Sequence, residues 1–176
     1  MAITRLNHAV LYVRDVSASV AFYRDVLGFR VKHELPGGVG AFLQAPDSTT
    51  DHDIAFFGIG AGAGASQAGR STVGLYHLAW EVQTLDDLEG YAERLAEAGA
   101  LVGASDHGTT KSLYAKDPDG IEFEVVWIIP AHLLDEAAIA AGKGRILPLD
   151  IAKEKARYGA DTRGGLGVSI PLGVTV

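Results

Sequence analysis

The chain has 176 residues and a formal net charge of −7, and it contains no cysteine. This length suits one compact domain or two small modules that share a core. The negative charge and the lack of a basic stripe argue against nucleic-acid binding, and the absence of cysteine excludes disulfides and thiolate ligands. Any bound metal ion must therefore be held by His, Asp or Glu side chains.

The N-terminal residues 1–13 contain an apolar run that is too short to span a bilayer, and they lack a signal-peptide cleavage site. We therefore expect a cytoplasmic protein without membrane contact. Residues 6–13 read as a buried strand, in which His8 shares one face with Val10 and Tyr12 because successive side chains alternate. A polar side chain thus stands on an otherwise apolar strand.

An amphipathic helix follows, with Asp15 as its expected N-cap and Gly28 as its end. Turn signals then separate three further expected strands, at about 30–35, 39–45 and 52–59. Residues 61–74 are rich in Gly, Ala and Ser, which is typical of a flexible connector. The first half of the chain therefore reads as β-α-β-β-β.

The second half repeats this pattern. Residues 75–82 form an expected strand that contains His77, followed by a helix that Thr84 caps and Gly99 ends. Three more strands are expected at about 100–105, 111–116 and 121–129, with the sequence DPDG at 117–120 turning the last hairpin. The two histidines are 69 residues apart (77 − 8), which indicates an internal duplication.

The predicted fold class is α+β, with two tandem βαβββ modules that form a cupped mixed sheet around a metal site. The paired modules would occupy residues 1–129, at about 1–60 and 75–129. Residues 130–176 are expected to form a C-terminal extension with short helices and a loosely ordered, Gly-rich end. This extension would pack across the sheet or on a partner subunit.

Two histidines at matching positions predict a shared cavity, which a carboxylate of the last strand can reach. In IEFEVVW the side chains of Glu122 and Glu124 lie on one face and the large apolar side chains on the other. Two neutral imidazoles and one carboxylate suit Fe(II), and they leave coordination positions open. The alternative is that His8 and His77 are hydrogen-bonded core residues and Glu124 is solvated. Their repeat-matched positions favour the metal site.

The segments NHAVLYV, YHLAWEV and DPDGIEFE resemble the vicinal-oxygen-chelate superfamily, which includes glyoxalase I, extradiol dioxygenases, and fosfomycin- and bleomycin-resistance proteins. The resemblance covers about residues 5–128. It implies that His8, His77 and Glu124 are the metal ligands, because the ligand glutamate of the family falls four residues after the Gly of DPDG. The resemblance therefore favours Glu124 over Glu122 as the ligand.

The subgroup is indicated by the position that corresponds to Glu124 in the first module, which is Ala55 (124 − 69). Glyoxalase I and the fosfomycin enzymes would supply a ligand glutamate there or from a partner subunit. The alanine leaves a three-ligand site with vacant positions. Such a site resembles that of the extradiol, catechol 2,3-dioxygenase-like enzymes.

The same resemblance assigns three catalytic residues. His52, in DHDIAF, corresponds to a histidine that acts as acid and base, although a surface turn histidine would fit the sequence equally well. Tyr114, ten residues before Glu124, would donate a hydrogen bond to a substrate oxygen. His107 would be a second polar contact in the pocket, and His33 and His132 are expected to be structural or exposed.

These residues predict a non-haem Fe(II) extradiol-type dioxygenase acting on a catechol-like aromatic, with dioxygen as co-substrate. Mn(II), Ni(II), Co(II) or Zn(II) would also fit the donor set. One alternative is a metal-dependent lyase or isomerase of the glyoxalase or epimerase kind. Another is a metal-free binding protein like the bleomycin-resistance proteins. A homodimer or a higher homo-oligomer is compatible with the sequence.

Overall fold

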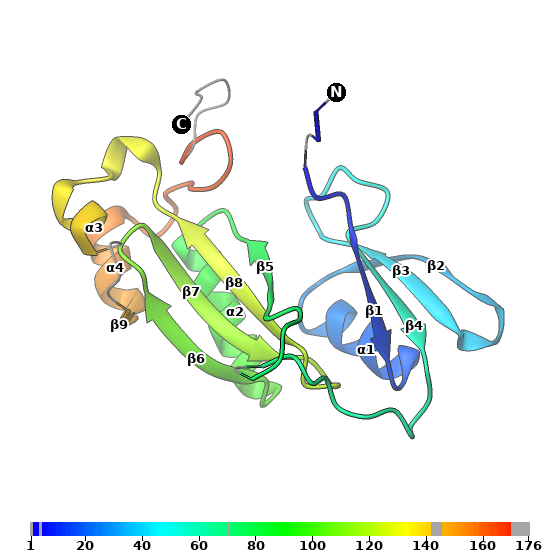
Figure 1. The fold of residues 1–176 in the computed structure, drawn as a ribbon. Coiled ribbons are helices and arrows are strands. Elements are labelled where there is room, and N and C mark those ends of the chain that lie inside the picture. The colour runs from blue at the N-terminus through cyan, green and yellow to red at the C-terminus, as the bar shows by residue number, and fades with distance from the viewer. Residues whose placement is uncertain (1, 4, 70, 142–145, 170–176) are drawn as a thin grey trace. The chain divides into compact units, whose positions relative to one another are not determined.

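The structure is a computed structural model that describes residues 2, 3, 5–69, 71–141 and 146–169 (Figure 1). It contains two compact units. Unit 1 comprises Met1–Gln67 with Asp117–Ile121, and unit 2 comprises Ala68–Lys116 with Glu122–Val176. None of the helices in the described ranges is long and apolar enough to cross a membrane.

Unit 1 contains one βαβββ module. Its elements are β1 (Ala9–Val13), α1 (Val16–Asp25), β2 (Arg30–Glu34), β3 (Gly40–Gln44) and β4 (Ile54–Gly58), with a short 3-10 turn at Pro36–Gly38. The strand order is β1-β4-β3-β2, with β1 parallel to β4 and the other neighbours antiparallel. The sequence order β-α-β-β-β is therefore the order that the residue patterns predicted.

Helix α1 begins where the sequence predicts. The side chain of Asp15 accepts hydrogen bonds from the backbone N–H groups of Ser17 and Ala18, which would otherwise lack partners. The helix covers one face of the sheet (Figure 1), where its Tyr23 packs against Phe56 of β4 with ring centroids 4.9 Å apart. The core of unit 1 thus lies between α1 and the sheet.

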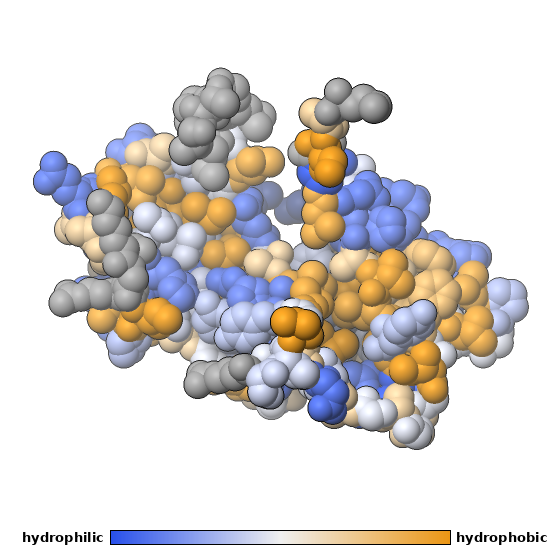
Figure 2. All heavy atoms as spheres, in the orientation of Figure 1, coloured by the Kyte–Doolittle hydropathy of each residue, from blue (hydrophilic) through white to orange (hydrophobic). Residues whose placement is uncertain are grey.

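The opposite face of this sheet is less covered. Hydrophobic side chains gather on the surface over the sheet of unit 1 in Figure 2, and Val10 and Tyr12 of β1 are both exposed. They alternate along the strand with the buried Leu11 and Val13. The alternation places Val10 and Tyr12 on the face away from α1.

Unit 2 contains the second βαβββ module. Its elements are β5 (Leu78–Glu81), α2 (Leu85–Glu97), β6 (Leu101–Asp106), β7 (Thr110–Lys116) and β8 (Glu122–Ile128). The strand order is β5-β8-β7-β6-β9, and β5 is parallel to β8. Thr84 and Asp87 form a reciprocal capping box at the start of α2.

The C-terminal extension completes unit 2. It contains a 3-10 turn (Ala131–Leu133), α3 (Glu136–Ala141), β9 (Leu147–Pro148) and α4 (Ile151–Tyr158). Helix α4 contacts α2, and its Tyr158 lies against Trp127 of β8 with ring centroids 5.8 Å apart. Strand β9 extends the sheet by pairing with β6.

The glycine-rich end of the chain makes specific contacts as far as Ser169. The indole N–H of Trp127 donates to the carbonyl of Thr162, and the Ser169 hydroxyl donates to the carbonyl of Ile128. The backbone N–H of Leu166 donates to Glu81. Residues 160–169 thus include several anchored positions, whereas 170–176 lie outside the described residues, so the loosely ordered end stays a prediction.

The fold class predicted from the sequence is confirmed: the chain is α+β, with two βαβββ modules followed by helices. The two strands expected to contain His8 and His77 were each predicted to start three residues too early, at 6 and 75. Strand β1 begins at Ala9 and β5 at Leu78, so that His8 and His77 each stand immediately before a strand. The reason in β1 is its partner strand, because the first contact is between the Ala9 N–H and the carbonyl of Asp53.

Candidate metal-binding and catalytic site

Strand β8 presents its carboxylates on the face that the helices leave free. Phe123, Val125 and Trp127 are buried, while Glu122 and Glu124 alternate with them and are half-buried. This is the alternation that the sequence predicted. It leaves Glu124 able to contact side chains of β5 and β7 on the free face of the sheet.

His77 and Glu124 lie together in unit 2. The Nε2 atom of His77 is 3.2 Å from Oε2 of Glu124, and both side chains are mostly buried. The Nδ1 atom of His77 is buried and has no hydrogen-bond partner among the residues that the structure describes. One imidazole nitrogen and one carboxylate oxygen thus face each other, which is a donor pair that suits a divalent transition metal.

Tyr114 and His107 extend this group. Tyr114 is directly opposite Glu124 in the β7–β8 pair, and its hydroxyl donates to Glu124 Oε1 at 3.5 Å. The Nε2 atom of His107 is 2.8 Å from the same hydroxyl. Burial, followed by the negative charge of Glu124, raises the pKa of Tyr114, so the phenol is neutral and can donate a hydrogen bond at neutral pH.

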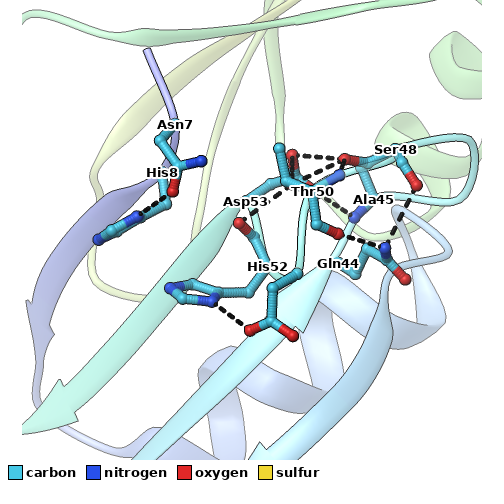
Figure 3. A network of polar contacts seen from close by, with 9 residues as sticks. Asn7, His8, Gln44, Ala45, Ser48, Thr50, His52 and Asp53 are labelled. Carbon is cyan, nitrogen blue, oxygen red and sulfur yellow. Dashed lines mark hydrogen bonds and ion pairs between the residues drawn. The ribbon is translucent and has the colours of Figure 1, made fainter.

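A second pair of histidines lies in unit 1. The rings of His8 and His52 have centroids 4.5 Å apart. The Nδ1 atom of His8 is 2.8 Å from Asn7 Oδ1, and that of His52 is 2.9 Å from Asp51 Oδ2 (Figure 3). These contacts occupy Nδ1 of each ring, so Nε2 is the nitrogen that each ring can offer to a metal or a substrate.

The loop that carries His52 is held by a network around Asp53 (Figure 3). The Asp53 carboxylate accepts hydrogen bonds from the Ala45 N–H and from the hydroxyls of Ser48 and Thr50, each at 2.8 Å. Gln44 also donates to the carbonyls of Ser48 and Thr50. We refer to the contacts of Asp53 as the Asp53 network. It makes the loop between β3 and β4 a preorganised support for His52.

Sequence reasoning did not find the role of Asp53. The segment PDSTTDHD does carry a signal, because short polar side chains readily bond to nearby backbone groups and close compact loops. That signal predicts a turn, but it does not say which carboxylate is at its centre. His33 and His132, which were not assigned to the site, are both exposed.

The predicted ligands are divided between the two units. His8 belongs to unit 1, whereas His77 and Glu124 belong to unit 2. Within the described parts of the chain, no group of three His, Asp or Glu side chains is close enough to hold a metal ion. The structure brings His77 and Glu124 together, and their role as ligands together with His8 is part of the proposal below.

The register of the sheets identifies the counterpart of Glu124. In the β5–β8 pair Glu124 lies opposite Ala79, and in the β1–β4 pair Ala55 lies opposite Val10. Each partner is two residues after the histidine that precedes its strand. Ala55 is thus equivalent to Glu124, as the 69-residue offset predicted.

A family model describes the glyoxalase/bleomycin resistance protein/dioxygenase superfamily and matches residues 5–125, which contain both modules. The chain belongs to this superfamily. The family that the motifs indicated is thereby confirmed.

Similar members of the superfamily include named dioxygenases. Biphenyl-2,3-diol 1,2-dioxygenase 3 from Rhodococcus globerulus is 39% identical over 117 residues, which are 66% of this chain and 59% of the relative. Catechol-2,3-dioxygenase from Bacillus subtilis (strain 168) is 29% identical over 123 residues, which are 69% of this chain and 41% of the relative. The chain therefore matches less than two thirds of the length of these relatives.

Two solved structures share the fold. A glyoxylase/bleomycin resistance protein/dioxygenase domain from Frankia sp. EAN1pec has a TM-score of 0.60 at 26% identity, covering 71% of this chain and 92% of that one. The fosfomycin resistance protein FosX from Listeria monocytogenes has a TM-score of 0.53 at 22% identity, covering 70% and 90%. Both matches support the same βαβββ architecture.

Proposed function

We propose that this superfamily member is an Fe(II)-dependent, extradiol-type dioxygenase that cleaves the ring of a catechol-like aromatic. His8, His77 and Glu124 would hold the metal ion. The observation that carries the proposal is the 3.2 Å contact between His77 and Glu124 beside the hydroxyl of Tyr114. The dioxygenases among the similar proteins support the same chemistry.

The donor set fits the proposed metal. Two neutral imidazoles and one carboxylate are the donor types of a facial triad, and the chain has no cysteine to favour zinc or copper. Bound Fe(II) would supply open coordination positions for two vicinal substrate oxygens and for dioxygen. Mn(II), Ni(II), Co(II) and Zn(II) are also compatible with these donors.

The remaining polar side chains of the site would orient the substrate and move protons. Tyr114, which stays protonated, would donate a hydrogen bond to a substrate oxygen, and His107 would hold the phenol in place. His52 would accept and return a proton during ring opening, since its Nδ1 atom contacts Asp51 and its Nε2 atom is the nitrogen that it can offer to the substrate. The exposed apolar side chains of Val10 and Tyr12 would provide surface for an aromatic ring.

The activity can be tested with the purified 176-residue chain reconstituted with Fe(II) under anaerobic conditions. Catechol, 4-methylcatechol and biphenyl-2,3-diol are then added under air, and both oxygen uptake and the yellow ring-fission product are measured. We expect one molecule of dioxygen to be consumed for each molecule of product formed. Iron-loaded protein that consumes no oxygen with any diol would contradict the proposal. Turnover of a hemithioacetal with Ni(II) or Co(II) and no oxygen uptake would favour the isomerase alternative.

The ligand assignment has its own test, which does not depend on the substrate. Glu124→Gln and His77→Ala should each lower metal affinity by more than about 100-fold, because even outer contacts of a metal ligand change affinity by 10- to 100-fold. His132→Ala is the matched control, since His132 is exposed and lies outside the proposed site. Equal metal content in the three variants after dialysis would exclude the assignment. The metal-free alternative predicts this result as well.

A further inference from the structure

A buried lysine lies next to the turn that carries His107. The side chain of Lys111, in β7, is 1% exposed, and its Nζ atom is 2.5 Å from Asp106 Oδ1 and 3.0 Å from Glu154 Oε2. Glu154 belongs to α4 of the C-terminal extension and is also buried. Because buried charges are stable only when they are paired, these three side chains fix one another. We refer to Asp106, Lys111 and Glu154 as the buried charge cluster.

Asp106 also shapes the turn itself. Its Oδ1 atom accepts the backbone N–H of Gly108 at 2.7 Å, and Gly108 has a φ of +80°, which favours glycine. His107 lies between these two residues, and its Nε2 atom is 2.8 Å from the Tyr114 hydroxyl. The position of the His107 ring therefore depends on a turn that the Asp106 carboxylate closes.

The buried charge cluster connects this turn to the C-terminal extension. Burial by itself would raise the pKa of Asp106, but the hydrogen bonds from Lys111 and Gly108 lower it below its usual value. Asp106 is therefore ionised at neutral pH and attracts the lysine. Lys111 in turn pairs with Glu154, so the helix α4 and the turn share one cation.

We propose that Asp106, Lys111 and Glu154 are positioning residues that hold His107 against Tyr114, and that the C-terminal extension thereby contributes to the site. This inference rests on the proposed function, in which His107 and Tyr114 orient the substrate. None of the three side chains is placed against the substrate. They act on the reaction only through the geometry of the His107 turn.

The other face of α4 offers a matched control. Lys155 pairs with Asp86 and Glu89 of α2 at 2.7 and 2.6 Å, and these carboxylates are well exposed. This ion pair helps α4 to dock on α2 but makes no contact with the His107 turn. Lys155→Gln therefore weakens the docking of the helix without changing the buried charge cluster.

The test uses the double variant Lys111→Met/Glu154→Leu in the full chain. Lys111 and Glu154 are replaced together so that neither of these two fully buried side chains is left as an unpaired charge, while Asp106, whose side chain is 18% exposed, keeps its hydrogen bond from the Gly108 N–H. In ¹⁵N-labelled protein without metal or substrate, we expect the His107 Nε2 resonance to shift relative to the parent. Its assignment follows from its loss in His107→Gln. In the Fe(II)-loaded enzyme, kcat should fall about tenfold with a nearly unchanged KM, since misplacing an orienting group slows the chemical step.

Lys155→Gln should leave both the resonance and kcat at parental values. An unchanged His107 resonance in the double variant would overturn the proposal, as would an equal change in the double variant and in Lys155→Gln. If the double variant does not fold, Asp106→Asn gives the same readout, because it weakens the contact with Lys111 while keeping an acceptor for Gly108. The resonance is measured without turnover, so an inactive parent would contradict the proposed function and still leave this test decisive.

Discussion

Ala55 occupies in the first module the place that Glu124 occupies in the second. Each lies opposite the residue two positions after a histidine, in a parallel strand pair of its own sheet. The duplication has therefore kept the backbone register and changed the side chain. A carboxylate at one of two equivalent positions leaves the proposed metal with open coordination sites, which dioxygen chemistry requires.

Ala55→Glu should convert this open site into a closed one. Ala55 is fully buried, so the metal-free variant should be less stable than the parent by about 1–3 kcal/mol. With Mn(II), its unfolding temperature should rise more than that of the parent, and its ring-cleaving activity with Fe(II) should fall at least about tenfold because a coordination position is taken. Ala55→Gln is the control, because glutamine has the same size as glutamate and carries no charge. If the two variants respond equally to the metal, position 55 does not face the metal.

Tyr114→Phe should lower kcat by about 10- to 100-fold while the metal stays bound, because one hydrogen bond to the developing charge of the substrate is lost. The phenylalanine keeps the ring in β7 and removes only the hydroxyl that contacts His107 and Glu124. Steady-state kinetics and iron content are the measurements. A variant with parental kcat would show that the phenol has no part in the reaction.

Asp53→Ala should release the loop that carries His52. Three hydrogen bonds to the carboxylate are lost, which should lower the free energy of unfolding by about 2 kcal/mol in urea denaturation. Activity should fall by more than the fraction of unfolded protein accounts for, because the loop no longer holds the backbone of His52 in one position. Thr49→Ala, at an exposed position of the same loop, is the control and should change neither quantity. Equal effects of both changes would argue against the Asp53 network.

Asp117→Asn should change how stability depends on pH. Burial raises the pKa of Asp117 from 3.8 to about 6, so the folded protein holds this proton more tightly than the unfolded chain. The resulting stability is present below about pH 4 and is lost as the pH rises through 6, with an upper bound of about 3 kcal/mol. The asparagine still offers an oxygen to the N–H groups of Asp119 and Ile121.

The variant should therefore be more stable than the parent at pH 8 and lose less stability between pH 4 and 8, as measured by urea unfolding at both values. Asp161→Asn, at an exposed carboxyl, should keep the parental pH dependence. A parental pH profile in Asp117→Asn would mean that this carboxyl does not remain buried while it titrates.

Much of the fold was predictable because local patterns carried it. The alternation of Glu122, Phe123 and Glu124 sets the two faces of β8, and the caps at Asp15 and Thr84 set the starts of both long helices. Strand ends were less predictable, since a strand starts where its neighbour begins to pair. That is why His8 stands just before β1 and not within it.

The candidate site was predicted in part. Sequence patterns and the family resemblance indicated His77, Glu124 and Tyr114, and the structure brings these three together in unit 2. They gave no indication of Lys111, which reads as a surface residue because lysine is seldom buried. Its burial depends on Glu154, which is 43 residues further along the chain (154 − 111).

The sequence by itself determined the two βαβββ modules and the equivalence of Ala55 and Glu124. The spacing of apolar residues and the helix caps are local features, and the distance between the two repeats is read directly from the residue numbers. The tertiary structure decided which side chains became partners. The pairing of Lys111 with Glu154 and the Asp53 network arise only when distant segments pack and exclude water, since a buried charge must then find its partner in space.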